Sequence, residues 1–488
     1  MIRKFLVSLF LFFAAVSVLN AQQTLTTLSL SADFNSVAGT PRVVRNGFKH
    51  FWVTVWRQQG NPAKLVSRII QSDGTVAAPK VLISGVSGFE GAFDIMYDTI
   101  NYTYLLAFET TKGLQVQFYN ANFVKTGSPV LIEDGLTNSL PRLAYDETGK
   151  RFTIFYVSSK DGVAQRELKS RSLDAQGKPL ANADSLATAA AGMHYGSLSV
   201  STNSKSGNML VLVQHGSTNS NELLGYAARP DGSLLKTAPL RLQPATVGLN
   251  TMADASFASD GSGFALWSDR TAVKFRKLSA TMGFAGATKS IAGAADGNSQ
   301  ATSLVLDSRN GQYLPVWTKA NQAVSAAFNL ATGAVIKAPF NVAASALTNS
   351  RNAATSYDPS QGNALVVWED SSAPAGAAAS GATFRVRAAI FFLAGTTSSA
   401  SVTVGDNFFS PSTLTVQSGT TVQWVFSGRN PHTVTSSTGV FDSPQMTSGN
   451  FEFRFATPGT FNYFCRVHGQ AMSGTITVSG GNEPPTHY

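Results

Sequence analysis

The sequence predicts an all-β protein, a seven-bladed β-propeller followed by a small β-sandwich. The composition favours strands and turns, a short apolar motif recurs about every 50 residues, and a C-terminal segment breaks this period. Apolar residues make up 43% of the 488-residue chain and charged residues only 13%, which is a globular rather than a disordered composition. The 42 glycines and frequent β-branched residues favour strands joined by tight turns.

The charge pattern gives no sign of a nucleic-acid partner. The net charge of +9 comes from 37 basic and 28 acidic residues. The basic residues are scattered and form no run, which is typical of a solvated surface. We therefore expect no nucleic-acid binding.

The first residues have the order of a secretory signal. Arg3 and Lys4 precede an apolar stretch from Phe5 to Val18, and the small residue Ala21 follows. This order predicts a signal peptide cleaved after Ala21, with an uncleaved anchor as the alternative. No later segment approaches the ~20 apolar residues of a membrane-spanning helix. We expect an exported protein, periplasmic or secreted, without a membrane span.

A short apolar run, usually ending in an aromatic residue, recurs from residue 51 to residue 368. Tight Gly turns, as at 72–75 and 229–233, follow several copies and indicate hairpins. A unit of about 50 residues with about four strands has the size of one propeller blade. Tandem β-sandwich modules are the weaker alternative, because each needs about 100 residues. The seven runs are FWVTVW (51–56), YLLAF (104–108), FTIFY (152–156), MLVLV (209–213), GFALW (263–267), YLPVW (313–317) and ALVVW (364–368).

The two ends of the repeat region complement each other. The last copy stops at residues 385–395 without a final strand, and residues 24–31 read as the missing one. We expect these segments to pair and close the ring, because closure removes an open sheet edge. The expected boundaries are a signal peptide at 1–21, the propeller at 24–395, a linker at 396–401, a second domain at 402–479 and a flexible tail at 480–488.

Residues 402–479 read as a small β-sandwich. The segment 414–426, LTVQSGTTVQWVF, predicts a hairpin of two strands about a Gly turn. FNYF at 461–464 and GTITVS at 474–479 predict the last two strands, and no stretch predicts a helix.

Cys465 is the only cysteine, so no intramolecular disulfide can form. In an exported chain such a residue indicates intermolecular pairing, a reactive thiol or a metal ligand. His468 and Met472 follow it closely, and His432 comes just after an earlier strand. One thiolate, two imidazoles and a weak axial thioether form the ligand set of blue copper. Zinc is the rival, but closed zinc sites usually use four Cys or His ligands rather than Met.

The C-terminal domain resembles the plastocyanin/azurin-type cupredoxins, especially bacterial plastocyanin-like modules. The resemblance rests on FFSPSTLTVQSGTTVQWVF, on PHTV, on YFCRVHGQAM and on SGTITV, all within 402–479. It implies one type 1 copper per chain, with His432, Cys465 and His468 as strong ligands. Met472 is then the axial ligand, and Gln470 is the alternative to it.

The resemblance implies an electron carrier rather than an enzyme. A filled coordination sphere leaves no position for substrate, and a redox partner would dock briefly near His468 over a small area. The propeller shows no catalytic spacing, so we expect it to act as a platform for a ligand or a protein. Two alternatives stay open: a cell-surface ligand-binding or adhesion protein with structural or vestigial copper, and an enzyme on the propeller that receives electrons from the copper domain.

Overall fold

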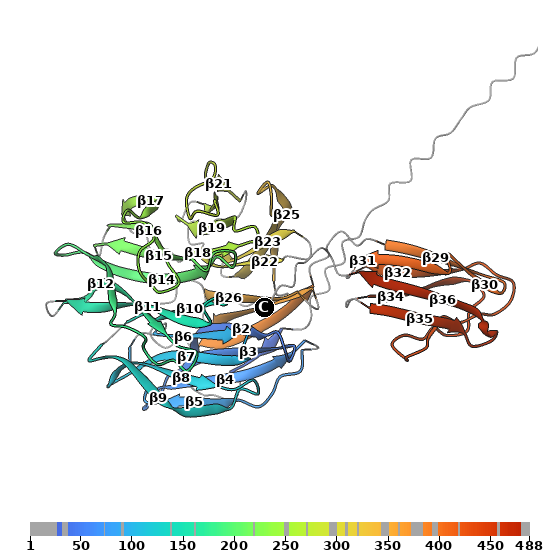
Figure 1. Ribbon diagram of the computed structural model, residues 1–488, viewed down its shortest axis with the longest axis horizontal. Helices are drawn as coiled ribbons and strands as arrows, with labels where there is room; N and C mark the ends of the chain where they lie inside the picture. Colours follow the sequence, from blue (N-terminus) through green and yellow to red (C-terminus); the bar gives the residue numbers. More distant parts are fainter. Residues whose placement is uncertain are drawn as a thin grey trace, which may run out of the picture.

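The computed structural model forms nine four-stranded sheets in the residues that it describes (Figure 1). Seven sheets come from residues 28–392 and two from residues 399–479. Among these residues, no helix has the length and apolar character needed to cross a membrane. The predicted signal peptide, residues 24–26 and the tail lie outside the described residues, which are 27–31, 38–72, 74–88, 92–136, 139–160, 163–217, 220–247, 253–269, 272–291, 300–307, 311–319, 322–342, 351–359, 362–371, 384–392, 399–417, 420–455 and 459–479.

Six of the first seven sheets each consist of four consecutive antiparallel strands, and the seventh joins the first strand of the chain to three late ones. The six sheets are β2 (Ala38–Asn46), β3 (Phe51–Gln58), β4 (Lys64–Gln71) and β5 (Lys80–Ser84); β6 (Phe93–Asp98), β7 (Thr103–Thr110), β8 (Gly113–Tyr119) and β9 (Lys125–Asp134); β10 (Arg142–Asp146), β11 (Arg151–Lys160), β12 (Val163–Leu173) and β13 (Asp184–Thr188); β14 (His194–Thr202), β15 (Met209–Gly216), β16 (Ser220–Ala228) and β17 (Leu240–Val247); β18 (Ala253–Phe257), β19 (Gly263–Ser268), β20 (Val273–Leu278) and β21 (Lys289–Ser290); and β22 (Gln300–Asp307), β23 (Gln312–Lys319), β24 (Gln322–Asn329) and β25 (Val335–Asn341). The seventh is β26 (Arg351–Asp358), β27 (Asn363–Ser371), β28 (Phe384–Phe392) and β1 (Leu28–Ser29).

The recurring apolar run is the second strand of every one of these sheets. The runs lie in β3, β7, β11, β15, β19, β23 and β27. Their last residues are buried, and Trp56 and Trp317 have no exposed surface. Because a neighbouring sheet covers each face of such a strand, the strand is apolar throughout rather than alternating. The repeat therefore predicted the sheets correctly.

The first and last strands of this region pair as expected. β1 runs antiparallel to β28, with Leu28 opposite Ala388 and Ser29 opposite Arg387. The next residue, Leu30, is fully buried in the cluster that contains Trp52 and Trp56. The prediction that the early segment supplies the missing strand is confirmed for residues 28 and 29.

The first strands of the seven sheets contact one another in sequence and close a ring, so these sheets form a β-propeller. They surround a polar cavity of about 420 Å³. A polar contact crosses each of the seven junctions between sheets: Arg42 Nε–Asp94 Oδ1 (3.5 Å), Leu143 N–Asp94 Oδ2 (2.9 Å), Arg142 Nε–Leu198 O (2.7 Å), Ser201 Oγ–Ala255 O (2.5 Å), Leu304 N–Asp254 Oδ2 (2.9 Å), Thr355 N–Ser303 Oγ (3.3 Å) and Thr40 N–Glu369 Oε1.

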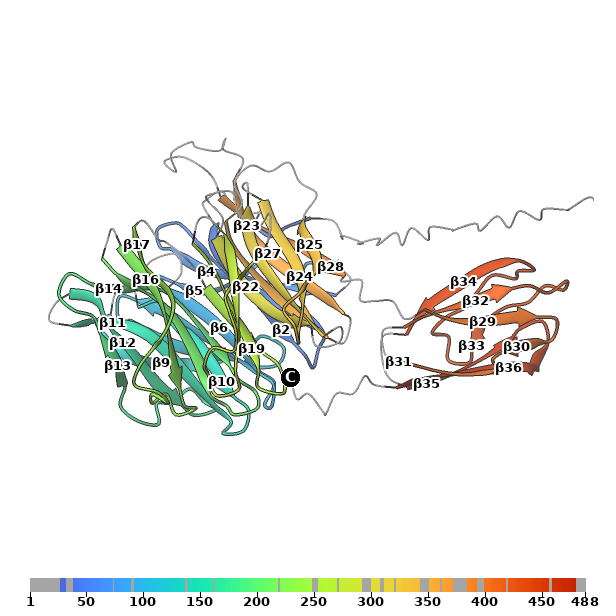
Figure 2. The same ribbon diagram turned by 90° about the horizontal axis from the view of Figure 1, so that it is seen from above.

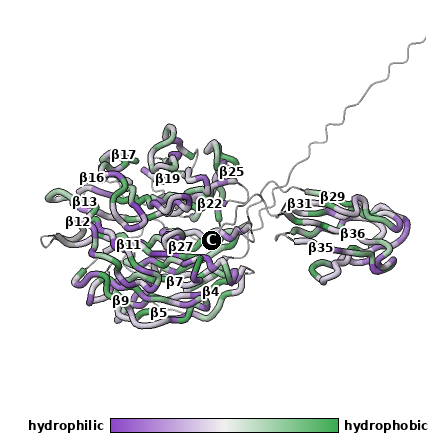
Figure 3. The backbone as a smooth tube through the Cα atoms, in the orientation of Figure 1, coloured by the Kyte–Doolittle hydropathy of each residue, from purple (hydrophilic) through white to green (hydrophobic). Residues whose placement is uncertain are grey.

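The C-terminal domain is a two-sheet sandwich, drawn in orange and red in Figure 2. Green and purple segments interleave along its strands, because hydrophobic residues face inward and polar ones outward (Figure 3). One sheet has the order β30-β29-β32-β34 and the other β31-β36-β35-β33. The strands are β29 (Ser399–Gly405), β30 (Phe408–Ser410), β31 (Thr413–Gln417), β32 (Thr421–Phe426), β33 (Thr435–Ser436), β34 (Gly449–Arg454), β35 (Gly459–Cys465) and β36 (Gly469–Ser479).

Two expectations for this domain need correction. β31 and β32 do not form a hairpin: β31 pairs parallel with β36, and β32 pairs parallel with β29. The chain passes from one sheet to the other because both strands bury apolar residues, such as Val416 and Trp424, in the shared core. β29 also begins at Ser399, inside the segment predicted as linker.

Candidate metal centre

Three of the predicted ligands come from segments that the sandwich brings to one end. Cys465 is the last residue of β35, where alternation places Tyr463 and Cys465 in the core. His468 lies in the short connection to β36, and its backbone N–H donates to the carbonyl of Cys465 at 3.2 Å. His432 is held by two backbone hydrogen bonds with Met446, each 2.9 Å long.

The three side chains converge on one point. Sγ of Cys465 lies 3.4 Å from Nδ1 of His468 and 3.9 Å from Nδ1 of His432. One ligand atom from each residue lies within 4.8 Å of the others, and the two imidazole centroids are 4.8 Å apart. Cys465 and His432 are fully buried, whereas His468 is partly exposed. The cluster is therefore closed to solvent except on the His468 side.

Met472, the predicted axial ligand, comes four residues after His468. It belongs to β36, where Cys465 pairs with Gly469 but Phe464 pairs with Ser473, so the residues between bulge out of the ladder. Its side chain is 1% exposed and packs in the same core cluster as Cys465. Gln470, the alternative to it, is exposed. Residues 470–472 therefore have no partner in β35, and the strand is locally irregular at this point.

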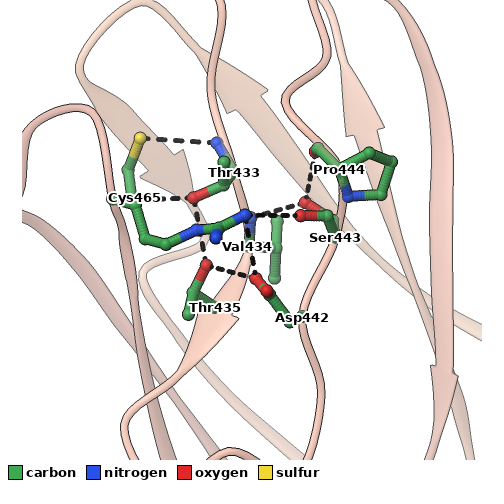
Figure 4. Close-up of polar contacts among 8 residues, drawn as sticks. Thr433, Val434, Thr435, Asp442, Ser443, Pro444 and Cys465 are labelled. Atoms are coloured by element: carbon green, nitrogen blue, oxygen red, sulfur yellow. Dashed lines mark hydrogen bonds and ion pairs between the residues drawn. The ribbon is translucent and has the colours of Figure 1, made fainter.

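A hydrogen-bond network, which the sequence did not reveal, surrounds the thiol (Figure 4). The backbone N–H of Thr433 donates to Sγ of Cys465 at 3.4 Å. The hydroxyl of Thr433 accepts the backbone N–H of Arg466 at 2.8 Å and contacts the Thr435 hydroxyl at 3.1 Å. The Thr435 hydroxyl donates to Asp442 at 2.7 Å, and Asp442 pairs with the Arg466 guanidinium at 3.4 Å. The network joins the two segments that carry His432 and Cys465.

A carboxylate on a third segment contacts His432. Oδ1 of Asp406 lies 3.3 Å from Nε2 of His432 and accepts the backbone N–H groups of Asn430 and Arg429 at 2.9 Å each. The hydrogen bonds that Asp406 accepts from these two N–H groups, and then the one from His432, hold the pKa of Asp406 below its usual value. No sequence motif pointed to this residue.

The donor set fits copper. The buried sulfur of Cys465 accepts a backbone N–H, and the two imidazoles present Nδ1 toward it. Two nitrogens, one thiolate and a nearby thioether suit copper in both common oxidation states. His432, Cys465 and His468 would hold the metal, and Met472 is placed in the adjoining core.

Comparison with known proteins finds cupredoxins similar to the C-terminal part of the chain. The family model of the cupredoxin-like domain matches residues 376–478. A plastocyanin from Scenedesmus fuscus is 35% identical in an alignment 88 residues long, which covers 14% of this chain and 85% of the relative. A purple cupredoxin from Nitrosopumilus maritimus is 30% identical, with a TM-score of 0.16, over 16% of this chain and 99% of its own. A prolyl endopeptidase structure covers 88% of this chain and 55% of its own at 10% identity and a TM-score of 0.42.

Proposed function

Because the chain belongs to the cupredoxin family through its plastocyanin-like C-terminal domain, we propose that it is an exported electron carrier with one type 1 copper. The convergence of Cys465 Sγ with Nδ1 of His432 and of His468 carries the proposal. Copper supplies the exchange of a single electron when it is bound. The protein supplies a buried, preorganised set of donors, which keeps water away and limits rearrangement.

The exposed surface beside His468 suits a transient redox partner. Val467 is 48% exposed, and Pro431 and Ala471 are exposed as well. A small apolar surface permits brief docking with little buried area, which is typical of weak electron-transfer encounters. His468 links the buried thiol to this surface, because its Nδ1 lies 3.4 Å from Sγ of Cys465 and its side chain is partly exposed. Docking near His468 is therefore part of the proposal.

Copper loading followed by spectroscopy tests the site. We expect an intense visible charge-transfer band from the copper–thiolate bond, and loss of this band in Cys465→Ser. His215→Ala is a matched control, because His215 lies in the propeller and hydrogen-bonds Glu222 at 3.0 Å. A chain without the band in its native form, or a coloured Cys465→Ser variant, would contradict the proposal.

The propeller has a separate part in the proposal, as a platform for a ligand or a docking protein. Its closed ring of sheets offers a rigid support. Cross-linking of the full chain in its source compartment, with peptide mapping, tests this part. Cross-links on residues 28–392 support a platform, and cross-links confined to residues 399–479 contradict it. Detection of the mature N-terminus at Gln22 would support export.

A further inference from the structure

Asp406 lies in the connection between β29 and β30, which contains no predicted metal ligand, yet it contacts the predicted ligand His432. It follows β29, whereas His432 follows β32 and Cys465 ends β35. Its Oδ1 accepts two backbone N–H groups and lies 3.3 Å from Nε2 of His432. The side chain of His432 is 1% exposed and that of Asp406 is 36% exposed. The carboxylate thus joins a buried imidazole to the protein surface.

This contact is compatible with only one tautomer of a neutral imidazole. An ionised carboxylate only accepts hydrogen bonds, so Nε2 of His432 must be the donor. In the neutral imidazole Nδ1 is then unprotonated, and it is the nitrogen that faces Cys465. A metal-binding nitrogen must be unprotonated, and a hydrogen bond at the other nitrogen sets which one that is.

We propose that Asp406 is the positioning residue that fixes the metal-binding tautomer of His432 and that its charge favours the oxidised state of the copper. The second part rests on the proposed function. A negative charge near a metal stabilises the higher positive charge more than the lower one. Removal of this charge must therefore raise the reduction potential.

A glycine next to the contact allows a test that leaves the charge in place. A Cβ added at Gly428 would lie 2.5 Å from Oδ1 of Asp406 and 3.2 Å from Nε2 of His432. Gly428→Ala therefore separates the two groups, because the carboxylate must move. Asp406→Asn has the opposite effect: the amide oxygen still accepts the three hydrogen bonds, but the charge is gone.

Nitrogen NMR of the copper-free protein tests the tautomer without any metal. At a pH where histidine is neutral, we expect His432 to be protonated at Nε2 in the native chain and in Asp406→Asn. Asp406→Ala and Gly428→Ala should give a mixture of tautomers. A pure Nε2–H tautomer in Asp406→Ala would overturn the positioning role.

The reduction potential of the copper-loaded protein tests the charge effect. We expect Asp406→Asn to shift the ratio of Cu(I) to Cu(II) affinities about tenfold toward Cu(I), which is a rise of about 59 mV for a one-electron couple. Glu452→Gln is the control, because it removes an equal charge from an exposed residue that contacts Gln423. Equal shifts in the two variants would overturn the charge effect. Failure of the native chain to bind copper would overturn the proposed function and leave the tautomer result standing.

Discussion

The hydroxyl of Thr433 accepts the backbone N–H of Arg466 at 2.8 Å, so the residue after His432 is tied to the residue after Cys465. The N–H of the same threonine donates to Sγ of Cys465. The backbone and side chain of one residue therefore link two segments 33 residues apart in sequence.

Thr433→Val tests this tie. The substitution conserves shape but leaves the Arg466 N–H without its acceptor, which should lower the free energy of unfolding by about 1–2 kcal/mol. Urea unfolding of the copper-free protein measures the effect. Thr433→Ser keeps the hydroxyl and should retain most of the stability. Equal loss in the two variants would show that the methyl group, not the hydrogen bond, stabilises the domain.

Met472→Leu tests the proposed axial ligand. Leucine fills a similar volume, so the substitution should cost less than about 1.5 kcal/mol in stability. The visible band should persist because the thiolate remains, and the reduction potential should rise because the weak thioether donor is lost. Electrochemistry of the loaded protein measures this change. Gln470→Ala is the control, and a shift in this variant with none in Met472→Leu would assign the axial position to Gln470.

The sequence predicted the sheets of the propeller well because hydrophobic periodicity reports burial. Runs such as GFALW are apolar on both faces, and each is a second strand. Periodicity does not report pairing partners, however. β31 and β32 have the same alternation as a hairpin, yet they enter different sheets, and only the shared core around Trp424 decides this.

The metal centre likewise contains residues that the sequence predicted and one that it did not. His432, Cys465 and His468 carry recognisable chemistry, and the structure brings their ligand atoms together. Asp406 lies 26 residues from His432 and acquires its role only when β29 packs beside β32. Carboxylates on strand connections are common, so no sequence pattern distinguishes this one.

Asp94→Ala tests the contacts between propeller sheets. Asp94 pairs with Arg42 at 3.5 Å and accepts the N–H of Leu143 at 2.9 Å, so it joins three sheets. Its removal leaves a largely buried guanidinium without its carboxylate, and we expect a loss of about 3 kcal/mol. Thermal unfolding measures this. Asp231→Ala, on an exposed turn beside Ser233, should change stability far less. Comparable losses would contradict the importance of the inter-sheet pair.

Because Asp254 is buried with a raised pKa, we expect the free energy of unfolding to depend on pH. Burial raises its pKa from 3.8 to about 7, although hydrogen bonds from Leu304, Ala255 and Ser201 oppose this rise. Between these two values the folded state holds a proton that the unfolded state releases. Stability should therefore fall as the pH rises through this range, by up to roughly 4 kcal/mol. Asp254→Asn should remove this contribution, so the difference between native and variant unfolding curves measures it. A difference that does not vary with pH would contradict the assignment.

The pairing of β1 with β28 has a consequence for how the chain matures. The strands that close the ring come from opposite ends of the repeat region. More than 350 residues must therefore be synthesised between them before they can pair. Until then β1 lacks its partner β28, and its unsatisfied backbone groups are free to pair with other nascent chains. Premature folding of the early sheets would therefore leave this edge open, whereas folding of the complete repeat region closes it.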